Sequence, residues 1–183
     1  MEFIEHEIPG VWEVRPKRFE DARGFFSETY KRSAFQERGV DIEFVQDNRS
    51  LSRFSGTIRG LHFQTPPFAQ AKLVSVTRGS ILDVAVDIRR GSPTFGRHVA
   101  VTLTAQDGAQ LLVPEGFAHG FCTLEPDCEV SYKVSALYSA ANDRAILWDD
   151  PALALPWPVT REAATLSDKD ARAPLLADAP ELF

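Results

Sequence analysis

Two short stretches of the sequence gather the side chains that could do chemistry. The first, from Gly56 to Gly79, sets His62 and Lys72 among apolar and β-branched residues that predict strands. The second, from Gly108 to Thr123, places His119 after a Pro-Glu-Gly turn. We interpret the two stretches as the walls of one pocket.

A histidine near a lysine inside a pocket with little water suits the removal of a proton from a carbon next to a carbonyl group. The neutral imidazole of His62 can accept that proton, and the ammonium group of Lys72 can stabilise the oxyanion of the resulting enolate. Lys72 shares the parity of Val74 and Val76, so on a strand it points to the same inward face. A lysine is seldom buried without a reason, so we expect it to act in the pocket.

The spacing of Arg59 and His62 sets a condition on the first stretch. Residues three apart on a regular strand point to opposite faces of the sheet. Both side chains can reach one pocket only if Gly60 carries a bulge or a bend. A place for both residues at one pocket therefore depends on an irregularity at Gly60, which a structure can check.

Bulk composition narrows the class of protein. The chain has 183 residues, 44% of them hydrophobic, which suits one domain over residues 1–183. The formal charge of -6 argues against a general nucleic-acid binder, because phosphate neutralisation requires a basic face. The N-terminal residues lack the features of a signal peptide, and no run approaches a membrane span. We expect a cytoplasmic protein in which Cys122 and Cys128 are free thiols.

The pattern of short elements predicts an all-β fold. Strand-like segments separated by Gly, Pro and Asp follow one another from Gly56 to about Leu137, without helices between them. This pattern is typical of an antiparallel sandwich or barrel. The expected strands cover residues 58–64, 71–77, 80–88, 98–103, 109–113, 117–123 and 129–134.

Less regular segments flank this block. Before it, residues 11–16 and 42–46 are expected to form short strands, and a turn around Arg23 leads into another. After it, residues 160–171 are expected to form a short helix or an extended arm lying on the barrel.

The clearest helix signal in the first half covers residues 33–38. Ser33 and Gln36 fit a capping box at its start. Gly39 fits a stop at its C-terminus.

The two stretches together resemble the two-part motif of the cupin superfamily. The resemblance implies a jelly-roll β-barrel, here with a few short helices and a C-terminal arm. Metal-binding cupins supply two histidines and a carboxylate from the first motif and one histidine from the second, whereas this chain has His62, Gln64, Lys72 and His119. Lysine beside a divalent ion is electrostatically unfavourable, and two imidazoles make a poor metal site. We therefore expect no metal and no cofactor.

A longer set of motifs resembles the dTDP-4-dehydrorhamnose 3,5-epimerases, from about Phe19 to Asp170. The linked runs are QDNxSxS from Gln46, RGLHFQ from Arg59, QxKLV from Gln70, DVAVDIR from Asp83, SPTFG from Ser92 and PxGFAHGF from Pro114. The resemblance implies a cofactor-independent isomerase that inverts C3 and C5, the carbons flanking the C4 ketone of dTDP-4-dehydro-6-deoxy-D-glucose. The product is dTDP-4-dehydro-L-rhamnose.

The resemblance also implies catalytic roles. His62 would be the general base, and Tyr132 would protonate the opposite face of the sugar. Lys72 would lie near the C4 oxygen and steady the enolate. Asp170, from the LSDKD run, would orient the imidazole, and Asp83 is a rival for that role.

Further matches imply residues that bind the substrate. Arg59 and Arg23 would hold the diphosphate, whose oxyanions suit planar cations. The other expected contacts are Gln46, Asn48 and Glu28 on the nucleotide side, Tyr138 stacked on thymine, and His119 at the sugar.

Two further features concern the partner subunit and the sugar. In this family the segment carrying Arg23 and Glu28 crosses to a second subunit, so a homodimer is implied. Relatives commonly place a glutamate where this chain has Asp143, so a shorter carboxylate is expected to substitute there.

Three other functions stay open. The nearest is a single-centre epimerase of a dTDP-4-keto-6-deoxy sugar, which inverts only C3 or only C5. The second is a sugar-nucleotide-binding cupin without turnover, against which His62 and Tyr132 count. The third is a metal-dependent cupin oxygenase, against which Gln64 and Lys72 count.

Overall fold

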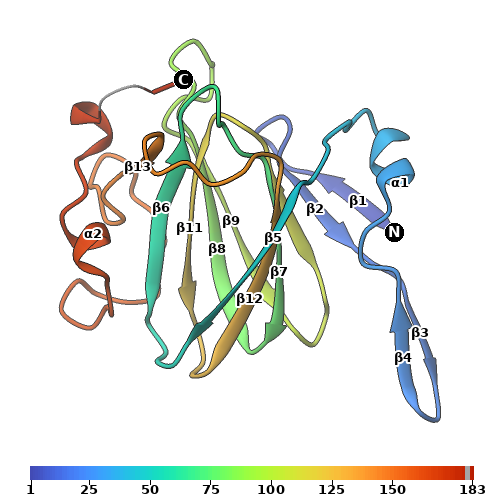
Figure 1. The fold of residues 1–183 in the computed structure, drawn as a ribbon. Helices are drawn as coiled ribbons and strands as arrows, with labels where there is room; N and C mark the ends of the chain where they lie inside the picture. The colour runs from blue at the N-terminus through green and yellow to red at the C-terminus, as the bar shows by residue number, and fades with distance from the viewer. Residues whose placement is uncertain (180–181) are drawn as a thin grey trace.

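Two antiparallel β-sheets face each other in the computed structural model, which describes residues 1–179 and 182–183 (Figure 1). The larger sheet has six strands in the order β1-β2-β10-β7-β12-β5, and the smaller has five in the order β13-β6-β11-β8-β9. The strands are β1 (Glu2–Glu5), β2 (Trp12–Arg15), β3 (Arg18–Asp21), β4 (Gly24–Ser27), β5 (Gln46–Ser52), β6 (Ile58–Gln64), β7 (Lys72–Arg78), β8 (Ser80–Asp87), β9 (His98–Thr104), β10 (Gln110–Val113), β11 (Phe117–Thr123), β12 (Cys128–Val134) and β13 (Asp143–Ala145). The predicted all-β jelly-roll fold is confirmed.

The central block of predicted strands agrees with the structure to within one residue at each end. Each strand pair in the two sheets is antiparallel, as the turn spacing predicts. Strands β3 and β4 form a separate hairpin that projects away from the two sheets (Figure 1).

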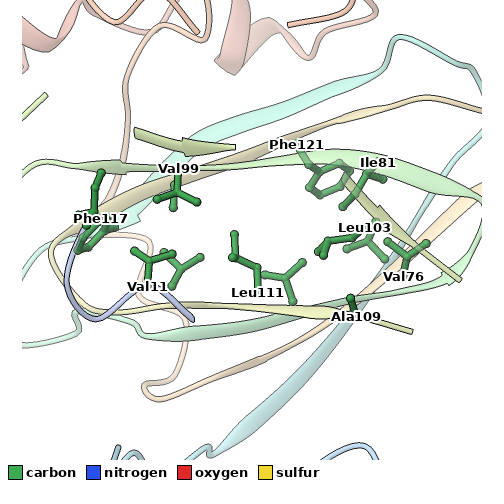
Figure 2. Close-up of a cluster of buried hydrophobic side chains, with 14 of the residues drawn as sticks. Val11, Val76, Ile81, Val99, Leu103, Ala109, Leu111, Phe117 and Phe121 are labelled. Carbon is green, nitrogen blue, oxygen red and sulfur yellow. The ribbon is translucent and has the colours of Figure 1, made fainter. Parts of the chain in front are cut away.

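The space between the sheets is filled by the largest apolar cluster. Figure 2 shows Val11, Val76, Ile81, Val99, Leu103, Ala109, Leu111, Phe117 and Phe121, all of them buried. They alternate along their strands because successive side chains point to opposite faces of a sheet. Lys72 has the parity of Val76 on β7 and His119 that of Phe121 on β11, and both are buried. The prediction that Lys72 faces inward is confirmed.

The irregularity at Gly60 that a shared pocket requires is present. On β11, His119 pairs with His62 and Phe121 pairs with Arg59, so two residues of β6 lie opposite Gly120 alone. This extra residue is a β-bulge, and it turns the strand between Arg59 and His62. Two side chains three positions apart can therefore reach the same cavity.

The short helix α1 (Arg32–Gln36) forms close to the predicted range, but its predicted capping box is wrong. Lys31 is the N-cap residue, and no side chain caps this end. Ser33 lies inside the helix, and the Gln36 amide donates to Asp41 at 2.9 Å instead. Gly39 has φ of +77°, which suits the predicted stop.

The strand predicted over residues 42–46 is wrong. The chain is irregular there, and β5 begins only at Gln46. Polar residues dominate β5, so its sequence lacks the alternation of apolar residues that signals a strand. The strand forms because it pairs along the full length of β12.

The C-terminal segment crosses the outside of the five-stranded sheet as an arm. Thr165 forms a parallel bridge with Thr57, the residue just before β6. Ser167 then caps the short helix α2 (Asp168–Ala171) by accepting a hydrogen bond from the Asp170 backbone at 3.1 Å. A 3₁₀ helix, η1 (Leu176–Asp178), follows. The arm expected over residues 160–171 is present, with only its last turn helical.

Two smaller observations concern the cysteines and the helices. Cys122 and Cys128 are free and buried, as predicted. Within residues 1–179 and 182–183, the helices are too short to span a membrane.

Replacement of Gly60 by alanine tests how closely β6 and β11 must approach. The new Cβ would lie 2.4 Å from the Gly120 Cα and 2.7 Å from the His119 carbonyl oxygen, at a φ of +130°. We expect Gly60→Ala to lower the free energy of unfolding by about 3 kcal/mol or more, measured by urea denaturation.

Two other glycines separate the effect of the contact with β11 from the effect of the positive φ. At Gly24 the φ is +126° but no atom lies within 4 Å, so Gly24→Ala should cost only about 1 kcal/mol. At Gly91 a Cβ also meets nothing within 4 Å and the φ is ordinary, so Gly91→Ala should be nearly neutral. Equal losses at Gly60 and Gly24 would show that the contact with β11 is unimportant.

Candidate active site

A hydrogen-bonded histidine and aspartate lie at the centre of the site. The Nε2 atom of His62 on β6 lies 2.5 Å from Oδ1 of Asp170 in α2. The imidazole is one-third exposed (33%), whereas the carboxylate is almost fully buried (4%). With Nε2 donating to the carboxylate, Nδ1 is left as the basic nitrogen.

The surroundings of Asp170 keep it ionised. Burial raises the pKa of its carboxyl group, but the hydrogen bond and charge of His62 lower it more, together with Ser167 and the Gly60 N–H. As a result, the pKa of Asp170 lies below the ordinary value of an aspartate. The bulge at Gly60 thus serves both partners, because it turns the strand before His62 and points an N–H group at Asp170.

Lys72 lines the same cavity as this pair. Its Nζ donates to the backbone carbonyl of His62 at 3.3 Å. Burial lowers the pKa of Lys72 to about 8, and the nearby carboxylates of Asp83 and Asp143 offset this only in part. Near neutral pH the side chain is still mostly a cation, held in a site with little water.

A second histidine–aspartate pair lies directly across the strands from the first. His119 is the β11 partner of His62, and its Nε2 lies 2.7 Å from Oδ1 of Asp83. Burial lowers the pKa of His119 despite the opposing charge of Asp83. The two carboxylates are therefore divided between the two histidines: Asp170, not Asp83, contacts His62.

Tyr132 faces the site from the opposite sheet. It lies on β12 of the six-stranded sheet, whereas His62 lies on β6 of the five-stranded sheet. Burial raises the pKa of the Tyr132 phenol, so the hydroxyl stays protonated and can donate. A basic nitrogen and an acidic hydroxyl thus lie on facing walls.

Two adjoining cavities share these groups. One, of about 480 Å³, extends past Arg59, Ile58, Phe121 and Leu166, and the other, of about 490 Å³, extends past Gln64, Gln70 and Tyr138. Both are lined by His62, Lys72, Tyr132 and Lys169. We treat the two as one cleft with the reactive groups at its middle.

The structure brings most of the predicted binding residues to this cleft. Arg59 is fixed by bonds from Nε to the Ser52 hydroxyl at 3.0 Å and from its terminal nitrogen to the Leu51 carbonyl at 3.1 Å. The other predicted residues that line the cleft are Gln46, Asn48, His119, Tyr138 and Asp143.

Arg23 and Glu28 are not brought to the cleft of their own chain. Arg23 lies at the turn of the projecting hairpin, where its side chain is 89% exposed and pairs with Asp21 at 2.5 Å. Glu28 is exposed just beyond β4. Neither residue lines the two cavities.

Sequence reasoning missed Lys169. Its Nζ donates to Oδ2 of Asp143 at 2.5 Å, and the Tyr138 hydroxyl donates to the same oxygen at 3.2 Å. Its position beside Asp170 in the LSDKD run is a signal that could have indicated a place at the cleft.

The donor set does not fit a divalent metal ion. The Gln64 amide donates to the carbonyls of Phe68 and Leu137 and accepts from the Ser139 N–H, so it holds two loops rather than facing an ion. Each histidine is committed to its own aspartate, with the Lys72 ammonium close by. In the part of the chain that the structure describes, no three His, Cys, Asp or Glu side chains gather as a metal site would require.

The site geometry therefore suits proton transfer. A histidine supported by a buried carboxylate can act as a base, a tyrosine on the facing sheet can act as an acid, and a buried cation can stabilise negative charge between them.

Comparisons with known proteins agree with this geometry. The family described as dTDP-4-dehydrorhamnose 3,5-epimerase matches residues 5–178. The dTDP-4-dehydrorhamnose 3,5-epimerase of Sinorhizobium fredii is 51% identical over 183 residues, covering 100% of this chain and 93% of that relative.

Two crystal structures superpose closely. The Bacillus anthracis dTDP-4-dehydrorhamnose 3,5-epimerase, with TDP and PPi bound, has a TM-score of 0.92 at 50% identity, covering 95% of this chain and 98% of the other. The Legionella pneumophila dTDP-6-deoxy-D-glucose-3,5-epimerase, in complex with dTDP-4-keto-L-rhamnose, has a TM-score of 0.91 at 43% identity, covering 96% and 93%.

The buried charge of Lys72 predicts a pH-dependent stability. Because its pKa is about 8 in the folded protein and 10.5 as the ordinary value, the unfolded chain binds more protons between these two pH values. The free energy of unfolding of the wild type should therefore rise, relative to Lys72→Met, by roughly 3 kcal/mol from pH 7 to 10.5. Urea unfolding of both proteins across this range measures the difference. A constant difference would show that Lys72 is not buried as a cation.

Proposed function

Because the chain belongs to the dTDP-4-dehydrorhamnose 3,5-epimerase family, we infer that it converts dTDP-4-dehydro-6-deoxy-D-glucose to dTDP-4-dehydro-L-rhamnose. The observation that carries this inference is the His62–Asp170 pair, which faces Tyr132 across a cleft that also holds Lys72. The reaction inverts C3 and C5, and the C4 ketone between them makes both protons acidic enough to remove.

We propose that His62 removes each proton. Its Nδ1 accepts the proton while Nε2 remains bonded to Asp170, whose negative charge stabilises the imidazolium that forms. Electrons from the broken C–H bond move to the C4 oxygen, where the Lys72 ammonium stabilises the enolate. Asp170 positions the ring and does not contact the sugar.

Tyr132 completes the inversion. From the opposite wall, its hydroxyl delivers a proton to the other face of the same carbon, and the C4 ketone reforms. His62 is then protonated and Tyr132 deprotonated, so exchange with solvent must reset both groups before the next inversion. The phenol suits this role because burial raises its pKa and keeps the proton in place until the enolate forms.

The remaining cleft residues bind the substrate in this proposal. Arg59 holds the diphosphate, with its guanidinium already oriented by Ser52 and Leu51. Gln46 and Asn48, joined by a 2.7 Å hydrogen bond, contact the nucleotide. The sugar and base contacts are His119, Asp143 and the exposed ring of Tyr138 on thymine.

We propose a homodimer in which the hairpin β3-β4 reaches the partner. The hairpin exposes Phe19, Phe25 and Phe26, at 54%, 58% and 70%, far more apolar surface than a free hairpin would favour. It also carries Arg23, and Glu28 follows it. An arm placed on the partner would bring both residues to the partner's cleft.

The dTDP-linked sugar is the one small-molecule partner that the proposal requires. The proton transfers above use no cofactor, and the net charge of -6 is unfavourable for nucleic acid. We place the enzyme in the cytoplasm, in keeping with the two free, buried thiols.

Incubation of the enzyme with its substrate in D2O tests the proposed function. We expect deuterium at both C3 and C5 by NMR, and an L-rhamnose-type product when a reductase traps the ketone. Deuterium at one carbon would identify a single-centre epimerase, and none at either would indicate a binding protein or an enzyme of another substrate.

The same assay tests the two proton-transfer residues. His62→Ala should lower turnover by at least about 100-fold while nucleotide affinity stays near that of wild type. Tyr132→Phe should lose net inversion but keep some deuterium exchange, because abstraction does not need the acid. His98→Ala, on the edge strand β9, is the matched control and should behave as wild type. Normal inversion by either cleft variant would remove that residue from the mechanism.

The dimer is tested by sedimentation of Phe26→Asp, which should be monomeric because a charge replaces an apolar contact. Phe54→Asp changes a phenylalanine of similar exposure, 63% against 70%, outside the hairpin, and should stay dimeric. A dimeric Phe26→Asp would place the interface elsewhere.

A further inference from the structure

We propose that Asp143 and Lys169 form a clasp that positions the C-terminal arm, and with it Asp170, at the cleft. In this role both act through Asp170 and are positioning residues. The inference rests on the proposed function, because it concerns the carboxylate that supports the proposed base.

The clasp joins two segments next to the base. Lys169 precedes Asp170 in α2, and its Nζ lies 2.5 Å from Asp143 Oδ2. Asp143 begins β13, which pairs with β6 so that Ala145 lies opposite His62. The ion pair therefore connects Lys169, the neighbour of Asp170, to β13, the strand that pairs with β6 at His62.

The short helix α2 needs such a restraint. It has four residues, and a single helical turn has almost no stability of its own. Upstream, Thr165 bonds the backbones of Gly56 and Ile58. Downstream, the arm is next fixed where Leu147 donates to the Pro174 carbonyl at 2.7 Å.

Between these two anchors the clasp is a side-chain tie from the arm to the barrel. Asp168 pairs with Arg172 within the arm and so adds no tie to the barrel. Without Lys169, the helix would depend on the hydrogen bonds of Asp170 to His62 and to the Gly60 N–H, with Leu166 packed against the barrel just upstream.

The surroundings of Asp143 make this ion pair stronger than an ordinary surface pair. Its side chain is only 19% exposed, and the Tyr138 hydroxyl donates to the same oxygen that Lys169 contacts. A surface pair loses most of its energy to water, whereas partial burial and a third group reduce that loss. The same bond holds Tyr138 at the cleft.

The two charges also act on Lys72 with opposite signs. Asp143 raises the pKa of Lys72, and Lys169 lowers it. While the clasp is closed, these influences oppose each other. Removing only Asp143 would leave an uncompensated cation near the proposed enolate-stabilising group.

Steady-state kinetics of Lys169→Gln, Asp143→Asn and the double variant test the clasp. Each single variant should lower kcat by about 10-fold or more, because the base loses a correctly placed carboxylate. KM should change less than kcat, and the double variant should be no worse than the more impaired single variant, because both changes break the same tie. Lys169→Arg, which can keep the ion pair, should recover most of kcat.

Arg161→Gln is the matched control. Arg161 lies on the same arm and pairs with Asp149 at 2.6 Å, but neither residue lines the cleft. This variant should keep the kcat of wild type. An equal loss of kcat in Arg161→Gln would mean that arm stability in general, not the clasp, determines the rate.

Amide hydrogen exchange gives a readout that does not depend on turnover. Lys169→Gln should exchange faster than wild type at residues 165–171, whereas Arg161→Gln should not. Unchanged exchange in Lys169→Gln, or a rise in KM with kcat unchanged, would overturn the clasp and leave Lys169 as a substrate contact only. If the wild type shows no deuterium at C3 or C5, the proposed function fails, while the exchange data still decide the clasp.

Discussion

The close contact between Gly60 and Gly120 is the constraint on which the site depends. The β6 and β11 backbones approach so closely that a Cβ atom on either glycine would collide with the other strand. This approach accommodates the bulge that brings Arg59 and His62 to one cavity. It also places the Gly60 N–H where it can bind Asp170. The absence of side chains at the two glycines thus allows Arg59, His62 and Asp170 to meet at one site.

Around this contact the barrel holds ionisable groups that an apolar interior would otherwise exclude. Burial alone opposes the charge of Lys72, Asp170 and His119. Each group is given partners instead: Asp83 for His119, His62 for Asp170, and a backbone carbonyl for Lys72. The apolar cluster of Figure 2 occupies the same interior, so the polar end of the barrel borders a core that excludes water.

Local sequence is enough to predict the direction in which side chains point along a strand. Strand parity correctly places Lys72 inward, and the three-residue spacing of Arg59 and His62 shows that a bulge is needed if both side chains are to reach one pocket. The wrong predictions have a common cause: at these positions contacts with distant parts of the chain, not the local sequence pattern, determine the structure. Strand β5 is polar and forms through its partner β12, and the predicted capping box is absent because Ser33 lies inside the helix. The Asp143–Lys169 contact depends on packing of the arm, which no local pattern records.

The His62–Asp170 bond joins residues 108 positions apart in the chain. Both barrel partners of Asp170, His62 and the Gly60 N–H, lie on β6, and the bulge that places them exists only when β6 pairs with β11. Strands from both sheets can therefore pair before the arm docks, giving a nearly complete barrel that lacks the carboxylate beside the proposed base. Catalytic competence would then be the last property to appear during folding, and the first to be lost when the end of the chain detaches.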